Sequence, residues 1–170
     1  MPPSRIVLFR HAEKYTESHI TDLSPEGWLR SRLLCRKLLM LYPDIEGIYA
    51  AGIGTIEKSR RKIQTVLPLI THMLIANKGE GAINTVRTAS ETKGTAKEIL
   101  KRSLYVNKTV IVCWAHSELP SLARELNGNP VPGNWPDNRY DVIWEINGKN
   151  GVLKQIPQLL LPGDSPFGID

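Results

Sequence analysis

Cysteine is scarce in this sequence, and its two cysteines stand far apart. Cys35 and Cys113 form neither a Cys-x-x-Cys pair nor any other metal-binding spacing. Cys113 lies in the apolar run "TVIVCW" and Cys35 lies in a helical pattern, so we expect two buried free thiols. The four histidines also lack a metal-binding spacing, so the sequence predicts no metal site and no other cofactor.

Long apolar runs are absent as well. None approaches the roughly 18 residues that a membrane-spanning helix needs, so we expect no membrane partner. The start "MPPSRIVLF" is typical of a strand and lacks the small-residue cleavage site of a signal peptide, which favours a cytoplasmic protein. The sequence has no repeats, and 170 residues suit a single domain over residues 1–170.

The charge balance is mildly basic. Basic residues outnumber acidic ones by 22 to 17, which gives a net charge of +5 and favours anionic partners. The densest basic cluster is "KSRRK", residues 58–62, and no basic stripe with interleaved aromatics accompanies it. The sequence therefore does not predict a nucleic-acid partner.

Strand and helix signals alternate along the chain. The continuous apolar run "IVLF" at residues 6–9 is typical of a strand that is buried on both faces. The pattern predicts strands over 6–9, 47–53, 83–88 and 108–116, and helices that start at Pro25 and cover 55–76, 90–104 and 117–128. This order predicts an α/β fold, a three-layer α/β/α sandwich with a mostly parallel sheet and helices on both faces.

Local signals place several element ends. Ser24 is a suitable N-cap with Pro25 at the first helical position, and Pro43 ends that helix. Pro68 is expected to kink or restart the second helix. After a loop rich in Pro, Gly and Asn, the alternating segments "YDVIWEI" and "GVLKQI" predict a hairpin within residues 140–156.

Histidines follow the two strongest apolar strands. His11 and His116 each stand just beyond the carboxyl end of such a strand, where α/β sheets bind their ligands. Arg10 precedes His11, and Arg60 or Arg61 opens the helix after the second strand. Two histidines and two arginines at one rim would make a cationic pocket that suits a phosphoryl group.

The segment after the second histidine adds hydrogen-bond donors. Ser117 is expected to cap the fourth helix. The free amides of Ser117, Glu118 and Leu119, together with the helix dipole, would then point toward the same phosphate position.

Several segments, in the right order, resemble the histidine phosphatase superfamily, the phosphoglycerate mutase-like proteins. "VLFRHAEK" is similar to the family's opening, where Arg-His-Gly is usual, and "LSPEGW" is similar to its Leu-Thr-x-x-Gly. "SRRKIQT" resembles its Arg-x-x-Gln-Thr helix, and "VIVCWAHSELPSLARELNG" resembles its second-histidine segment. "NWPDNRYDVIW" is similar to a stretch of a small RHAEK-type subgroup. The resemblance covers nearly the whole chain and implies a phosphoglycerate mutase-like fold.

The resemblance also implies residue roles. His11 would be the nucleophile that becomes phosphohistidine. Arg10 and a central arginine would bind phosphate oxygens, and His116 would stabilise charge on the transferring group. The family spacing places the central arginine at Arg61 in preference to Arg60.

The general acid is where the sequence departs from the family. The acid branch has Asp directly after the second histidine, but Ser117 stands there, and the insertion that carries the glutamate of mutases is missing. Glu118 is the leading candidate, with a plain helix-dipole role as its alternative. Glu13 is the second candidate, with an ion pair to Lys14 or an arginine as its alternative. Some small family members work without a strong acid when the leaving group is itself acidic.

The leading hypothesis is a small metal-independent phosphatase that hydrolyses a phosphomonoester through a phosphohistidine on His11. Its substrate would be a phosphorylated small molecule or a phosphoprotein. One alternative is a pseudo-phosphatase that binds a phospho-ligand or phosphoprotein with weak or no turnover. Another is a phosphoglycerate mutase-type phosphotransferase, which the short chain disfavours because a mutase needs a pocket closed to water.

Overall fold

The computed structural model describes residues 1–76 and 83–170, and these contain one six-stranded sheet. The strands are β1 (Arg5–Arg10), β2 (Ile45–Ala50), β3 (Ile83–Asn84), β4 (Thr109–Trp114), β5 (Val142–Asn147) and β6 (Leu153–Pro157). Their order across the sheet is β3-β2-β4-β1-β5-β6. The first four strands pair in parallel, whereas β5 runs antiparallel to both β1 and β6. The mostly parallel sheet and the closing hairpin are therefore confirmed.

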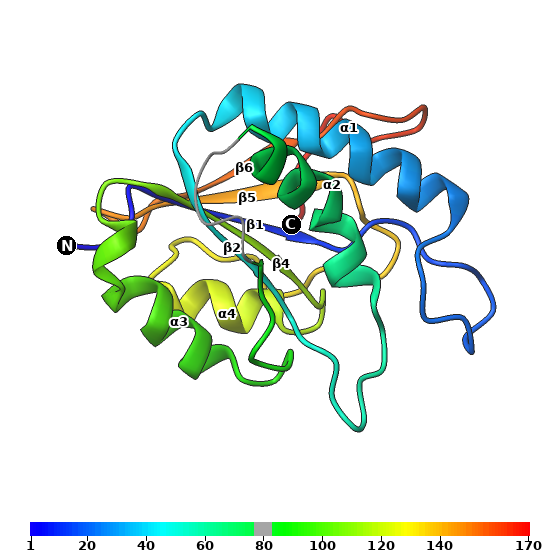
Figure 1. Cartoon of the computed structure of the whole chain (residues 1–170), viewed down its shortest axis with the longest axis horizontal. Helices are drawn as coiled ribbons and strands as arrows, with labels where there is room; N and C mark the ends of the chain where they lie inside the picture. The colour runs from blue at the N-terminus through cyan, green and yellow to red at the C-terminus, as the bar shows by residue number, and fades with distance from the viewer. Residues whose placement is uncertain (77–82) are drawn as a thin grey trace.

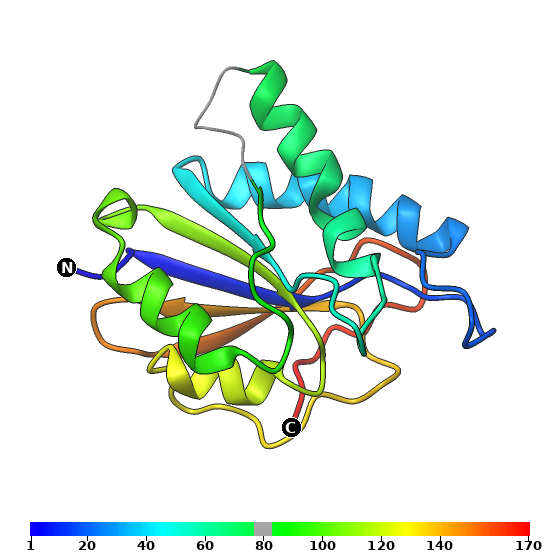
Figure 2. The same cartoon turned by 60° about the horizontal axis from the view of Figure 1, so that its bottom comes forward.

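Helices cover both faces of this sheet. They are α1 (Pro25–Leu41), α2 (Arg61–Ile75), α3 (Thr92–Lys101) and α4 (Leu119–Glu125), with a short 3-10 turn η1 (Ser103–Tyr105). Figures 1 and 2 show α1 and α2 side by side on one face and α3 and α4 on the other. The expectation of a three-layer α/β/α sandwich is confirmed.

The central strand β1 explains how two cores form on one sheet. Ile6 and Leu8 point into the cluster beneath α3 and α4, whereas Val7 and Phe9 point into the cluster beneath α1 and α2. All four side chains are fully buried. A strand that is covered on both faces needs apolar residues at every position, which is why its sequence is continuous and not alternating.

The ends of α1 and the two thiols follow the sequence signals. Ser24 is the N-cap of α1 and its hydroxyl accepts a hydrogen bond from the amide of Gly27, with Pro25 at the first helical position. Cys35 and Cys113 are buried free thiols, as expected. No helix within residues 1–76 and 83–170 has the length and apolarity needed to cross a membrane.

Several expectations about element boundaries are wrong. The second strand covers Ile45–Ala50 and not residues 47–53. The second helix begins at Arg61 and not at residue 55, because the Glu57 carboxylate accepts the Ser59 amide and holds a turn there. It then continues through Pro68 without a restart. The third strand stops at Asn84, whose side chain accepts the amide of Val86 and turns the chain away. The third helix covers Thr92–Lys101 and not residues 90–104, and Glu91 occupies its N-cap position.

Candidate active site

One cavity lies beyond the carboxyl ends of β1 and β4, which are hydrogen-bonded neighbours in the sheet. Its volume is about 110 Å³. The structure brings together around it Arg10, His11, Arg61, His116 and Ser117. Lys14, Glu57, Ser59, Lys62 and Ala115 complete the lining.

His11 lies at the buried floor of this cavity, with only 6% of its surface exposed. Its Nδ1 lies 2.7 Å from the carbonyl oxygen of Ala12, so Nδ1 carries the proton and donates it, which leaves Nε2 with a free electron pair. Burial, together with the positive charges of Arg10 and Arg61, holds the pKa of His11 well below its ordinary value. The imidazole is therefore neutral at neutral pH and can act as a nucleophile.

The start of α2 fixes the turn that carries His11. The Ala12 amide donates to the Thr65 hydroxyl at 2.9 Å, and that hydroxyl donates to the Arg61 carbonyl at 2.7 Å. Gln64 accepts the amide of Leu23 and thereby holds the preceding loop. The spacing Arg-x-x-Gln-Thr thus joins α2 to the loop after β1.

Arg60 and Arg61 lie in different surroundings although they are adjacent in sequence. Arg60 forms an exposed ion pair with Asp22 at 2.7 Å. Arg61 lines the cavity, donates to the Ile20 carbonyl at 3.1 Å, and leaves its Nε buried without a partner. Arg61, and not Arg60, therefore lines the cavity that holds His11.

Both terminal nitrogens of the Arg10 guanidinium donate hydrogen bonds, whereas its Nε has no partner. Its Nη1 donates to the backbone carbonyls of Pro136, Asp137 and Arg139, and the group lies 4.0 Å above the Tyr140 ring. Its Nη2 donates to the Asp137 carboxylate at 3.0 Å, whereas its Nε is buried without a partner. Arg10 therefore holds the 136–139 loop with Nη1 and retains an unpaired donor for a ligand.

Unpaired buried donors gather around this cavity. Within the described part of the chain, the Nε atoms of Arg10 and Arg61 and the Ser59 hydroxyl are buried without a partner. Lys62 is also buried, and it contacts the Glu57 carboxylate at 3.4 Å. Because buried polar atoms are normally paired, this arrangement indicates a ligand that supplies several acceptor oxygens and negative charge.

The expectation of free amides after His116 is wrong for two of the three residues. The amides of Glu118 and Leu119 both donate to the Ala115 carbonyl at 3.0 Å, and α4 starts only at Leu119. Ser117 therefore does not cap this helix; Glu118 occupies the N-cap position. His116 itself faces Asp137, with its Nε2 3.5 Å from a carboxylate oxygen.

Neither candidate for the general acid lines the cavity that holds His11. Glu118 lies in an adjacent cavity of about 360 Å³, which shares Glu57, Ala115 and Ser117 with the first. Glu13 accepts a hydrogen bond from Arg30 Nε at 2.7 Å. The structure therefore has the ion pair with an arginine that the sequence offered as the alternative role of Glu13. Through this pair the carboxylate connects the loop after β1 to α1.

Several residues at this site were not predicted from the sequence. Asp137 contacts Arg10, Lys14 and His116, and Lys62 and Ser59 lie in the lining. Asp137 belongs to the segment "NWPDNRYDVIW", whose subgroup resemblance was the available signal. Within the "KSRRK" run, Lys62 is buried whereas Arg60 is exposed, a difference that the run of like charges does not reveal.

No cluster of three or more His, Cys, Asp or Glu side chains suited to a metal ion occurs in residues 1–76 and 83–170. The charged groups at the candidate site are mainly cationic, and the carboxylates of Glu57 and Asp137 are each paired with a cation. These residues fit an oxyanion and not a metal ion.

Comparison with known proteins identifies the fold. No protein-family model and no curated protein sequence matches this chain. The structure of the protein histidine phosphatase SixA in complex with tungstate matches with a TM-score of 0.57 and 13% identity, over 91% of this chain and 97% of that one. A protein assigned as phosphohistidine phosphatase SixA from Agrobacterium tumefaciens matches with a TM-score of 0.52 and 14% identity, over 85% and 92%. One from Nakamurella multipartitia, with the same assignment, gives 0.53 and 13%, over 91% and 95%.

These three likenesses cover nearly the whole of each chain, at identities of 13–14%. The chain therefore has the phosphoglycerate mutase-like fold of the SixA histidine phosphatases, which confirms the fold that the sequence resemblance implies.

Proposed function

We propose that this protein is a histidine phosphatase that hydrolyses a phosphomonoester through a phosphohistidine on His11. In the first step Nε2 of His11 attacks phosphorus, and the bond from phosphorus to the leaving oxygen breaks with its electron pair. In the second step water attacks the phosphohistidine and releases inorganic phosphate and neutral His11. Each step is a displacement at phosphorus and needs no redox partner.

The observation that carries this proposal is a neutral, buried His11 that lines a cavity together with Arg10, Arg61 and Lys62. Phosphoryl transfer depends on alignment and charge stabilisation more than on covalent chemistry from the protein. Arg10 and Arg61, which both line the cavity, would bind the phosphate oxygens. His116 and the Ser117 backbone amide would also donate hydrogen bonds to the phosphate oxygens, and Lys62 would add positive charge to the site.

The cavity size bears on the substrate. About 110 Å³ accommodates a phosphoryl group, and the rest of the substrate then stays at the mouth. This supports either a phosphorylated small molecule or a phosphoprotein as the substrate. The neighbouring folds described as protein histidine phosphatase and phosphohistidine phosphatase favour a phosphoprotein. The two free thiols support the cytoplasm as the compartment.

Two alternatives differ from this proposal in their chemistry. The position of Glu118 and Glu13 outside the cavity favours a pseudo-phosphatase that binds a phospho-ligand. A binding protein, however, has no use for a neutral nucleophile among cations. A mutase needs a site closed to water, whereas the His116 side chain is 31% exposed.

The test is hydrolysis of para-nitrophenyl phosphate in EDTA by the wild type, by His11→Ala and by His72→Ala. His72 is a matched control because it is an exposed histidine on α2 outside the cavity. We expect release by wild type and His72→Ala, at least roughly 10³-fold less by His11→Ala, and an acid-labile phosphohistidine that only the first two form. A wild type that binds tungstate but releases no phosphate from any ester would favour the binding protein.

A further inference from the structure

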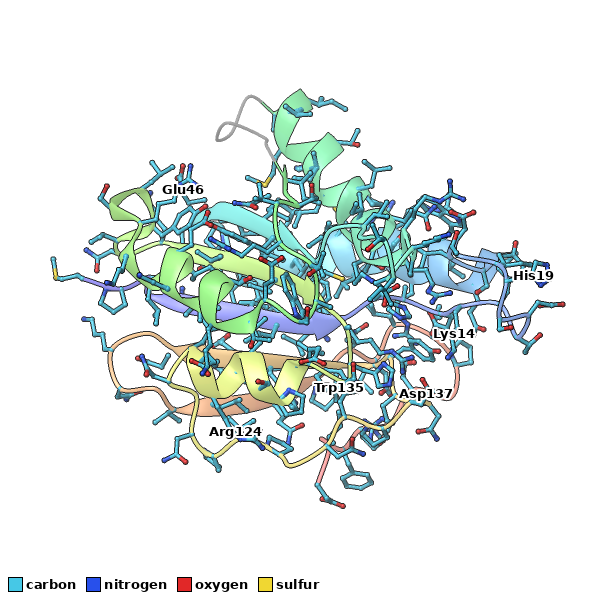
Figure 3. All side chains as sticks on the ribbon, turned by 90° about the horizontal axis from the view of Figure 1, so that it is seen from below. Lys14, His19, Glu46, Arg124, Trp135 and Asp137 are labelled. Carbon is cyan, nitrogen blue, oxygen red and sulfur yellow. The ribbon has the colours of Figure 1, made fainter. Side chains whose placement is uncertain are left out.

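Asp137 lies at the meeting point of three basic side chains. One oxygen of its carboxylate is 3.0 Å from Arg10 Nη2 and 3.3 Å from Lys14 Nζ. The same oxygen is 3.5 Å from His116 Nε2. All three basic residues line the cavity that holds His11, and Figure 3 shows Lys14 and Asp137 together beyond the end toward which β1 points.

Asp137 does not line this cavity itself, but all three side chains that it contacts do. Its side chain is 64% exposed, whereas His11 is 6% exposed. In-line transfer puts the attacking and leaving atoms on opposite sides of phosphorus. When the buried His11 attacks, the leaving atom therefore points away from it, toward the exposed side of the site, and the Asp137 carboxylate is an exposed group held there by three lining residues.

The loop that carries Asp137 is held in place from two sides. Arg10 Nη1 donates to three of its backbone carbonyls, so the phosphate-binding arginine and this carboxylate are joined directly. Trp135 is 1% exposed and its indole N–H donates to the Arg139 carbonyl at 2.8 Å. The carboxylate is thus positioned relative to His11 before any ligand arrives.

We propose that Asp137 is the proton donor to the leaving group in the phosphatase reaction. The inference rests on the proposed function and names the acid that it lacks. As the bond from His11 Nε2 to phosphorus forms, the leaving oxygen takes the electron pair of its bond to phosphorus and the proton of the Asp137 carboxyl. In the second step the resulting carboxylate takes a proton from the attacking water, phosphate leaves, and both residues return to their starting states.

Substrate binding supplies the required protonation. In the free protein burial raises the pKa of Asp137, but the hydrogen bond from Lys14 and the charges of Arg10, Lys14 and His116 outweigh it and hold the pKa below its ordinary value. A phosphoryl dianion would draw on the same three cations and place negative charge beside the carboxylate. Both effects raise the pKa of the carboxyl, so the proton is taken up as the substrate binds.

The experiment compares wild type, Asp137→Asn and Asn138→Ala on a series of phosphomonoesters, from dinitrophenyl phosphate to alkyl phosphates. Asn138 is the matched control because it is the next, exposed residue of the same loop. For Asp137→Asn we expect a loss of kcat/KM of at least about 10²-fold on alkyl phosphates and under about 5-fold on dinitrophenyl phosphate. Asp137→Glu should recover part of the loss.

Tungstate binding separates a proton donor from a residue that only positions Arg10. If Asp137 is the donor, Asp137→Asn should bind tungstate at least as tightly as wild type, because a competing carboxylate is removed. An equal loss on every ester, or weaker tungstate binding, overturns the inference and leaves the phosphatase proposal standing. A wild type that cleaves none of the esters overturns both.

Discussion

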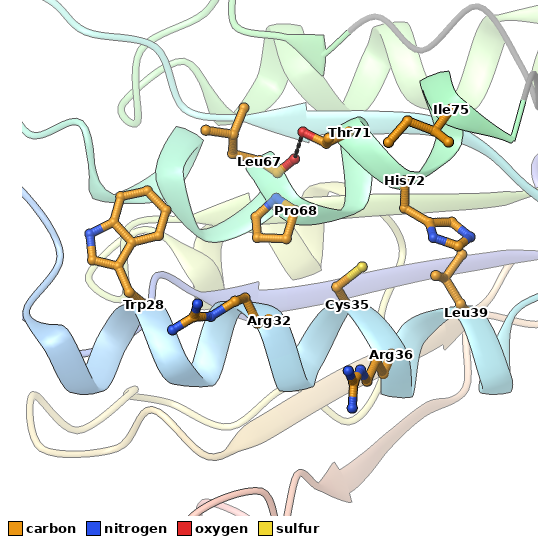
Figure 4. Close-up of a pocket in the computed structure, with 10 residues that line it drawn as sticks. All are labelled: Trp28, Arg32, Cys35, Arg36, Leu39, Leu67, Pro68, Thr71, His72 and Ile75. Carbon is orange, nitrogen blue, oxygen red and sulfur yellow. Dashed lines mark hydrogen bonds between the residues drawn. The ribbon is translucent and has the colours of Figure 1, made fainter.

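Two hollows in this protein differ in size and in chemistry. A groove between α1 and α2 has a volume of about 870 Å³, against about 110 Å³ for the cavity beyond β1 and β4. Figure 4 shows the groove and its mainly apolar lining: Trp28, Arg32, Cys35, Arg36, Leu39, Leu67, Pro68, Thr71, His72 and Ile75. None of these ten residues lines the smaller cavity.

The groove contains residue types that could react, but their surroundings make them inert. Burial raises the pKa of the Cys35 thiol, so it is protonated and a poor nucleophile. The hydroxyl of Thr71 donates to the Leu67 carbonyl within the same helix. In the small cavity, by contrast, burial and neighbouring cations keep His11 neutral among unpaired donors. The comparison teaches that unsatisfied charge and hydrogen-bonding capacity locate the chemistry better than volume does.

The largest expected effect tests the cationic cavity with two adjacent arginines. Arg61→Ala should lower kcat/KM for para-nitrophenyl phosphate by roughly 10²- to 10³-fold, because it removes a cation from the lining of the proposed phosphoryl site. Arg60→Ala should stay within about 3-fold of wild type, because its partner is the exposed Asp22. Steady-state kinetics of both variants checks this. Equal losses of kcat/KM in the two variants would contradict different roles for Arg61 in the cavity and Arg60 at the surface.

The next effect concerns α1. Its residues Trp28 to Leu39 border the groove, whereas Gly27 near its start packs against the loop after β1. A Cβ atom at Gly27 would lie 2.3 Å from the Glu13 carbonyl oxygen. Gly27→Ala should therefore push the loop after β1 away and cost about 1–3 kcal/mol in the free energy of unfolding, measured in urea. Phosphatase activity should fall as well. A fully stable and active Gly27→Ala would show that this close approach does not support the site.

The pH dependence should distinguish His11 from ordinary histidines. Its lowered pKa, caused by burial and by Arg10, Arg61 and Lys62, predicts that the acid limb of kcat/KM lies below pH 6.5. The unfolded chain binds this proton near pH 6.5 but the folded protein does not, so the free energy of unfolding falls as pH drops below 6.5 toward the folded pKa. Denaturant titrations between pH 7.5 and 5.5 should show a smaller fall for His11→Asn. Identical falls would contradict a lowered pKa.

The smallest effect should come from the groove. Leu67 is 45% exposed, so Leu67→Ala should cost no more than about 1 kcal/mol in unfolding free energy and leave kcat/KM within about 2-fold. Kinetics and urea titration of this variant check the expectation. A large loss of activity without a loss of stability would assign the groove a part in the reaction and break the comparison.

Local sequence signals were sufficient for the sheet and for much of the cavity. The apolar run of β1, the Ser24–Pro25 helix start and the histidine after each of two parallel strands depend on neighbours in sequence. They predicted the layer order and the residues that the structure brings together around the cavity, whereas the roles of these residues and the single domain over 1–170 stay predictions.

What escaped prediction depends on contacts between distant residues. Asp137 meets Arg10 across 127 positions, and no local pattern marks such a pair. The short turn held by Glu57 also escaped, because one side-chain hydrogen bond outweighed a helical pattern over 55–60. Glu118 was misplaced because its backbone amide turned back to Ala115 and moved the helix start.

The buried Arg30 has a consequence that reaches beyond its own surroundings. Its guanidinium donates to Glu13, next to the His11 turn, and also to Asp164 in the C-terminal tail. The tail and the His11 turn are therefore thermodynamically linked through one side chain. A ligand that tightens the turn also tightens the tail, and by reciprocity a tail that detaches lowers the affinity for that ligand. Protection of residues 158–170 from proteolysis would thus report the occupancy of the cavity.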